Sequence, residues 1–256
     1  MEGKLIKLVV LTTRCEFGAE LLRCLTARNI PVDAIILEKG YSVSRFAHYI
    51  KIRGFTETVK TIIQRIAGII LPATAPGWFR NEFYRNYSEN VFLVEDLGGT
   101  ECQKILTGIK PDIIALGRTR ILGEKIIRIP VCGILNAHPG LLPKYRGIDT
   151  VEWAIYNGDV IGATVHYIDI GVDTGPVIAQ KAVEIIPGDN LDSLNKKVDK
   201  TSIELMAEVI LRIRNGEKVA TIQQQPSQGR QYYRMPHKLV IVTRTKLKNL
   251  KRVTSG

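Results

Sequence analysis

Hydrophobic residues along this chain fall into short apolar runs that alternate with segments of helical periodicity. The apolar runs predict strands at 6–11, 32–37, 90–94, 112–116, 131–135, 164–168 and 177–185. Between them, apolar residues repeating every three or four positions predict helices at 17–25, 100–109, 150–156 and 191–214, and another helix ends at 129. Such an alternation predicts an α/β fold with a mostly parallel sheet and helices on both of its faces.

The boundaries of the longest predicted helix are marked by capping residues. Asp189 or Asn190 can cap its start, and Asn215-Gly216 is a typical stop. We therefore divide the chain at 215, into a main domain at 1–215 and a closing segment with a tail at 216–256.

Residues 41–90 interrupt the regular alternation. They are rich in Arg, Lys and aromatic residues, and Pro72, Pro76 and Gly77 break them into two or three predicted helices. Isoleucines between 62 and 70 repeat at helical spacing and predict one buried face. This insertion is either a lid or dimer contact with a functional role, or a surface-packed segment without one.

Bulk composition predicts a cytoplasmic protein. The 256 residues are 45% hydrophobic, enough for a full core. No apolar run reaches the roughly 18 to 20 residues that a membrane span needs, and the first residues lead into a strand instead of a signal peptide. The four cysteines show neither C-x-x-C spacing nor clustering with histidine, so we expect no metal site and no disulfide framework.

The formal charge of +11 is concentrated at the carboxyl end. Residues 230–256 hold eight Lys and Arg residues and no acid, which leaves +3 for the rest of the chain. Such a tail either binds phosphate groups or is simply solvated.

Two polar segments carry the candidate chemistry. The first runs from Asn136 to Gly147 and follows an apolar run, at the end of a predicted buried strand, where α/β folds place their sites. The second runs from His166 to Pro176. Taken singly, Asn136 can cap a turn, His138 can be a buried structural histidine, and Asp173 can belong to an ordinary turn.

Together these segments resemble the signature of the folate-dependent formyltransferases, Asn-x-His-Pro-(small)-Leu-Leu-Pro followed by His-x6-Asp-x-Gly-Pro. Gly140 stands where serine is common in that family. The resemblance covers roughly residues 5–215, is weak at 41–90 and is strong at 112–188. It implies a Rossmann-like catalytic domain with 10-formyltetrahydrofolate as donor, an amine as acceptor and no metal.

The resemblance also implies a catalytic role for three residues. Asn136 would donate its amide to the developing oxyanion, and His138, on the same side of an extended strand end, would exchange protons. Asp173 would stabilise the protonated imidazole and hold a water. His166 also occupies a family position, where we expect structural support of the site.

Two further loops are similar to those that hold folate in this family. Residues 116–122 resemble the loop that grips the pterin, which implies contacts from Arg120, Ile121 and Leu122. The alternative is the start of an ordinary helix that packs on the sheet. Asp169 would lie beside the pterin, with Ile170, Gly171 and Val172 making contact through their backbone.

The acceptor is the open question. Lys144, Tyr145 and Arg146 resemble a loop of formyltransferases that act on nucleotide-linked amino sugars, which implies acceptor contacts and favours such a small amine. Residues 15–18 resemble the corresponding loop of methionyl-tRNA and some sugar formyltransferases, and the Gly-Ser-Gly-Ser-Asn loop of glycinamide ribonucleotide formyltransferases is missing.

Four alternatives stay open. The basic tail keeps a tRNA acceptor in consideration, and glycinamide ribonucleotide or water, as in a formyltetrahydrofolate hydrolase, are others. A folate-binding protein without activity is the alternative from outside the enzymes. The sequence does not give the oligomeric state.

Overall fold

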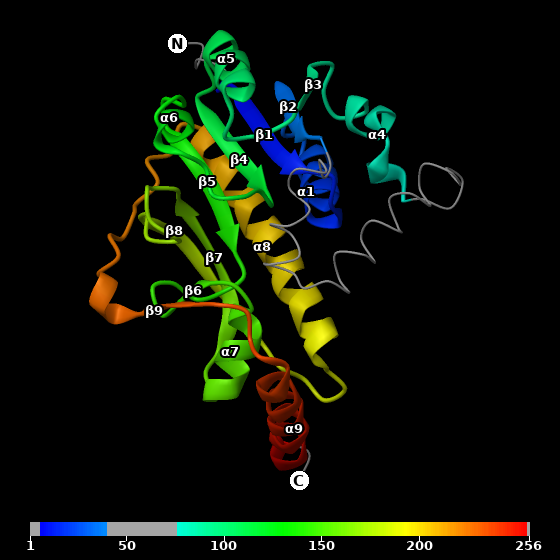
Figure 1. Cartoon of the computed structure of the whole chain (residues 1–256), viewed down its shortest axis with the longest axis vertical. Helices are drawn as coiled ribbons and strands as arrows, with labels where there is room; N and C mark the ends of the chain where they lie inside the picture. The colour runs from blue at the N-terminus through cyan, green and yellow to red at the C-terminus, as the bar shows by residue number, and fades with distance from the viewer. Residues whose placement is uncertain (1–5, 40–75, 255–256) are drawn as a thin grey trace.

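The computed structural model describes residues 6–39 and 76–254 (Figure 1). The isoleucine-rich part of the predicted insertion lies outside the described residues. The described end of the insertion forms a 3₁₀ turn, η2 (Gly77–Phe79), and a short helix, α4 (Asn81–Arg85).

A seven-stranded sheet forms the centre of the molecule, in the order β3-β2-β1-β4-β5-β7-β8. The strands are β1 (Leu8–Thr13), β2 (Ala34–Glu38), β3 (Val91–Val94), β4 (Ile113–Gly117), β5 (Gly133–His138), β7 (Ile161–Tyr167) and β8 (Val177–Val183). The first five strands in the sheet are parallel, whereas β7 and β8 are each antiparallel to their neighbours. The predicted α/β fold with a mostly parallel sheet is therefore confirmed.

Helices cover both faces of the sheet, as its strands require. Alternate residues of a strand point to opposite faces, and in β1 both sets are apolar. Leu8 and Val10 pack toward α1 (Glu16–Ala27) and α8 (Leu191–Arg214), while Val9 and Leu11 pack toward α5 (Thr100–Ile109) and α6 (Glu124–Ile127). Strands that are buried on both faces read as continuous apolar runs, which is the pattern that the sequence shows.

Capping residues mark where α8 begins and ends. The Asn190 side chain accepts a hydrogen bond from the backbone N–H of Ser193, and the Ser193 hydroxyl oxygen accepts one from the N–H of Asn190. Gly216, with φ of +77°, follows the last turn. The predicted start and stop of this helix are confirmed.

The sequence pattern did not predict four further elements, three of which lie in the carboxyl-terminal part. Strand β6 (Tyr145–Gly147) pairs in parallel with β9 (Arg230–Tyr232), after a 3₁₀ turn η3 (Pro226–Gln228). The basic tail forms a helix, α9 (His237–Thr254), which packs on α7 (Thr150–Asn157) and buries Thr243 and Leu247. Within the described ranges, no helix has the length and apolar character to cross a membrane.

Candidate active site

A cavity of about 1370 Å³ opens at the carboxyl ends of β1, β4 and β5. In the sheet β1 and β4 are neighbours, and the chain runs outward from them in opposite directions, to β2 on one side and to β5 on the other. Open α/β sheets bind ligands at such a switch point. The strand order therefore places the residues that follow β4 and β5 around one space.

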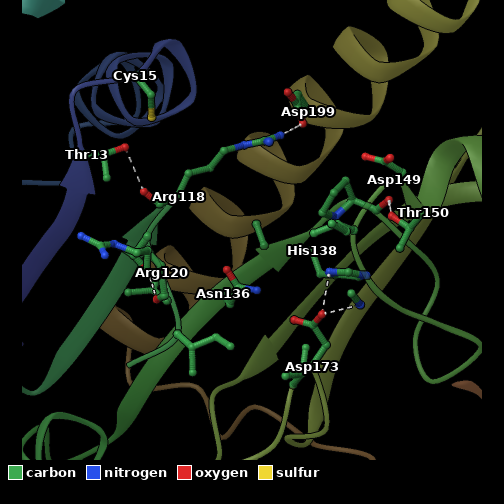
Figure 2. Close-up of a pocket in the computed structure, with 18 of the residues that line it drawn as sticks. Thr13, Cys15, Arg118, Arg120, Asn136, His138, Asp149, Thr150, Asp173 and Asp199 are labelled. Atoms are coloured by element: carbon green, nitrogen blue, oxygen red, sulfur yellow. Dashed lines mark hydrogen bonds and ion pairs between the residues drawn. The ribbon is translucent and has the colours of Figure 1, made fainter. Parts of the chain in front are cut away.

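Asn136 and His138 lie two residues apart near the end of β5 and both line this cavity (Figure 2). The Asn136 amide nitrogen is 3.1 Å from Nε2 of His166, which lies opposite it on β7. His166 Nδ1 is 2.8 Å from the carbonyl oxygen of Tyr167, to which it donates, so Nε2 is free to accept from Asn136. His166 thus orients the amide, the supporting position that we expected for it.

His138 is 3% exposed, and each of its ring nitrogens faces an oxygen acceptor. Nε2 lies 2.7 Å from the carbonyl oxygen of Tyr145, and Nδ1 lies 3.4 Å from Asp173 Oδ2. A neutral imidazole carries one proton, which Nε2 holds and donates to Tyr145, so Nδ1 is the nitrogen that takes up a second. Burial lowers the pKa of His138 by more than Asp173 raises it, so the ring is neutral at neutral pH.

Asp173 lies in the loop between β7 and β8 and is directed at His138 (Figure 2). Its backbone is left-handed, with φ of +54°, and its side chain is 13% exposed. Oδ2 accepts a 2.8 Å hydrogen bond from the backbone N–H of Gly147, and Oδ1 lies 3.6 Å from His166 Nε2. Burial alone would raise the pKa of this carboxyl, but the two histidines and the Gly147 N–H outweigh it and hold the pKa at about 2. The carboxylate is therefore ionised at neutral pH.

Most residues that we predicted to hold folate line the same cavity. Arg120, Ile121 and Leu122 do so beyond the end of β4. Arg120 forms an ion pair with the buried Glu38, and Leu122 also packs into the core under α6. The packing of Leu122 agrees with the helix-start interpretation, and the contact of this segment with folate stays a prediction.

The second predicted folate loop is organised by its own acid. Asp169 Oδ1 accepts hydrogen bonds from the Gly171 N–H at 3.0 Å and from the Thr174 hydroxyl at 2.6 Å. Asp169, Gly171 and Val172 line the cavity. Ile170 is not among the lining residues, and its side chain is 71% exposed.

Lys144, Tyr145 and Arg146 are not brought into the cavity. Tyr145 is 1% exposed, and its hydroxyl donates to Asp159, to which Lys144 Nζ also pairs at 2.8 Å. Arg146 Nη2 donates to the carbonyl oxygen of Gly229 at 3.2 Å. The acceptor role that we assigned to these residues stays a prediction, and the cavity lining lends it no support.

Polar groups that sequence reasoning missed line the other side of Asn136 and His138. Asn195 Nδ2 donates to Glu152 Oε1 at 2.7 Å, and Arg118 forms an ion pair with Asp199. These four residues and Asp149 line the cavity, and Figure 2 shows Asp149 and Asp199 on the side away from Arg120. They lie on or beside α7, α8 and the end of β4, where the sequence shows only the polar positions of amphipathic helices and a loop.

The sequence profile of the formyl transferase family matches residues 85–210. That segment makes up just under half of the chain. It contains Asn136, His138, Asp173 and both predicted folate loops. A methionyl-tRNA formyltransferase from Thermodesulfovibrio yellowstonii is 40% identical over 115 residues, which are 44% of this chain and 37% of that protein. The chain spans between about a third and three fifths of the length of the curated relatives that it matches.

Solved structures of formyltransferases share the fold over nearly the whole chain. Glycinamide ribonucleotide transformylase 1 from Symbiobacterium toebii superposes with a TM-score of 0.61 at 18% identity, covering 88% of this chain and 96% of that one. A 4-N formyltransferase from Francisella tularensis gives 0.60 at 19% identity, covering 95% and 88%. The domain therefore has the Rossmann-like formyltransferase fold.

Proposed function

We propose that this protein transfers a formyl group from 10-formyltetrahydrofolate to an amine of a small acceptor. The observation that carries the proposal is the convergence of the Asn136 amide, the neutral His138 imidazole and the ionised Asp173 carboxylate on one cavity within a formyl transferase segment. The cavity volume, about 1370 Å³, exceeds the range of roughly 300–1,000 Å³ that is common for drug-sized ligands, so it can admit two substrates.

The residues on either side of the three groups fit a folate and a polar amine. Ile121, Leu122 and the backbone of the Asp169 loop combine apolar surface with hydrogen-bonding groups, as binding of a flat heterocycle requires. When bound there, 10-formyltetrahydrofolate supplies the formyl carbon and the nitrogen that leaves. The opposite side presents the carboxylates and amide of Asp149, Glu152 and Asn195.

Asn136 and His138 divide the chemistry between charge and proton. The Asn136 amide has two N–H groups, of which His166 engages one, and the other is available to a carbonyl oxygen that becomes anionic during attack. One preorganised donor of this kind is typically worth roughly 3 kcal/mol.

The Nδ1 atom of His138 takes up the proton that the attacking amine loses and passes it to the leaving nitrogen. During this exchange Asp173 lies 3.4 Å from the protonated nitrogen and stabilises the imidazolium. The bond between the acceptor nitrogen and the formyl carbon forms, and the bond between that carbon and the folate nitrogen breaks. No third reactant is consumed.

A nucleotide-linked amino sugar is the acceptor that we favour. Carboxylate and amide side chains such as Asp149, Glu152 and Asn195 suit the hydroxyl groups of a sugar, because they accept and donate hydrogen bonds in directions that hydroxyls can satisfy.

A tRNA acceptor is the second candidate, and specific observations favour it. The first relatives found are methionyl-tRNA formyltransferases, and α9 exposes Lys238, Arg244 and Lys248. The affinity of this protein for tRNA should then fall steeply as the salt concentration rises, because phosphate contacts release counterions.

The experiment is mass spectrometry of amines incubated with the protein and 10-formyltetrahydrofolate. The panel contains amino-sugar nucleotides, glycinamide ribonucleotide and methionyl-tRNA, and His138→Ala is the control. Addition of one formyl group to one acceptor, absent in the variant, supports the proposal and names the acceptor.

The other outcomes overturn it in distinct ways. Formate without a formylated amine indicates a hydrolase. Folate binding without turnover over the whole panel, unchanged in His138→Ala, indicates a binding protein.

A further inference from the structure

A segment distant in sequence supports both loops that carry His138 and Asp173. It comprises residues 222–232, which we call the support segment. It begins beside β8, where Ile222 and Val177 exchange backbone hydrogen bonds of 2.8 and 2.9 Å, and it ends with β9.

Its β9 end holds the loop that comes after His138. Within the β6–β9 pair Tyr145 lies opposite Arg230 and Gly147 opposite Tyr232, and the N–H of Ile148 donates to the Tyr232 carbonyl oxygen at 3.2 Å. This is the same stretch that provides the Tyr145 carbonyl for His138 Nε2 and the Gly147 N–H for the Asp173 carboxylate.

The other end holds the Asp173 loop through one side chain. Gln224 Nε2 donates to the Asp173 carbonyl oxygen at 3.0 Å and to the Gly175 carbonyl oxygen at 2.6 Å, so both of its amide hydrogens are engaged. Its neighbours Gln223 and Gln225 are exposed. The middle residue of three consecutive glutamines is thus directed at the backbone of the proposed catalytic acid.

The backbone of Asp173 needs such support. A left-handed conformation is unfavourable for residues other than glycine, although aspartate tolerates it better than most. It persists where surrounding contacts determine it. Because Asp173 meets His138 at 3.4 Å, beyond a short hydrogen bond, a small rotation of this backbone carries the carboxylate out of range.

We propose that Gln224 is a positioning residue for the reaction, which holds Asp173 in its left-handed conformation and thereby keeps the carboxylate against His138. The inference rests on the proposed function for its catalytic meaning. Whether Gln224 holds Asp173 depends only on the two amide hydrogen bonds and can be tested without turnover.

The test replaces Gln224 with methionine, which has similar length and no donor, and uses Gln223→Met as the matched control. Histidine titration by NMR reads the contact directly. The charged or titratable groups acting on His138 are Asp173, His166 and Arg118, and Gln224→Met displaces only Asp173. We expect the pKa of His138 to fall further, because the negative charge of Asp173 moves away from the imidazole.

Activity gives the second reading. In Gln224→Met we expect kcat to fall roughly tenfold, since proton exchange loses its stabilising charge, with KM for the folate within about twofold. In Gln223→Met neither parameter moves. An unchanged His138 titration, or an equal loss of kcat in both variants, overturns the proposal.

Wild-type protein provides a check that does not depend on the variant folding. The side-chain amide hydrogens of Gln224 should exchange with solvent more slowly than those of the exposed Gln223 and Gln225, because they are donated to two backbone carbonyl groups in a part-buried position. Equal exchange of all three refutes the positioning. If the titration and exchange behave as expected while no acceptor is formylated, the positioning holds and the proposed function fails.

Discussion

Gly147 allows a sharp test of the contact between β6 and the support segment. Its φ is +97°, and a Cβ added there would lie 2.1 Å from the Tyr232 carbonyl oxygen, whereas real Cβ atoms essentially never approach within 3.0 Å. In Gly147→Ala the two strands must therefore move apart. Backbone strain of about 1–3 kcal/mol adds to about 1 kcal/mol for the lost Ile148 hydrogen bond, so the free energy of unfolding should fall by roughly 3 kcal/mol.

Gly158 is the matched control. Its φ is also positive, +76°, but no atom lies within 4 Å of the added Cβ. Gly158→Ala should thus lower the free energy of unfolding by only about 1 kcal/mol, through backbone conformation alone. The difference of roughly 2 kcal/mol corresponds to about 4–8 °C in Tm for a chain of this size.

Urea unfolding and formyl transfer measured on both variants decide the matter. Gly147→Ala should lose most of its kcat because its N–H no longer holds Asp173, while Gly158→Ala keeps normal kcat. Equal destabilisation of the two variants, or full activity of Gly147→Ala, would refute the idea that this close approach sets the geometry of the site.

Three other measurements test the site and its surroundings. Asn136→Ala should lower kcat by about 10²- to 10³-fold with folate affinity nearly unchanged, as measured by steady-state kinetics and a binding titration. Because burial lowers the pKa of His138, kcat/KM should stay high as pH falls to about 6.5 and decline only below it, as a pH–rate profile can show. Asp173→Asn removes a charge that raises this pKa, so the decline should move to still lower pH in that variant. Burial raises the pKa of Cys102 to about 12, so a thiol reagent at about pH 8 should label the exposed Cys132 in the folded protein and Cys102 only after unfolding, as peptide mass spectrometry can show.

The main sheet and its helices were predictable because their patterns are long and periodic. The predicted helix at 100–109 agrees with α5, and α8 begins and ends where its caps indicated. Strands β6 and β9 were missed because three residues are too few to show a period of two. The direction of β7 and β8 was missed because an apolar run does not reveal which neighbour it pairs with.

The candidate site divides in the same way. Asn136 and His138 share one strand, so their common direction follows from strand geometry, and Asp173 was found through its motif. The resemblance implied an acceptor contact for Tyr145, yet its side chain is buried, and Tyr232, distant in sequence, stacks on it with ring centroids 5.0 Å apart. Gln224 gave no signal, since polar repeats usually face solvent.

The pairing of β6 with β9 has a consequence for how the protein is made. When a ribosome has synthesised the chain through Asp173, the amide, the imidazole and the carboxylate all exist, but Gln224 and Tyr232 have not yet been translated. The nascent chain then has the reactive groups without the geometry that aligns them. Competence for chemistry should thus arise late in translation, after the support segment has left the exit tunnel and docked.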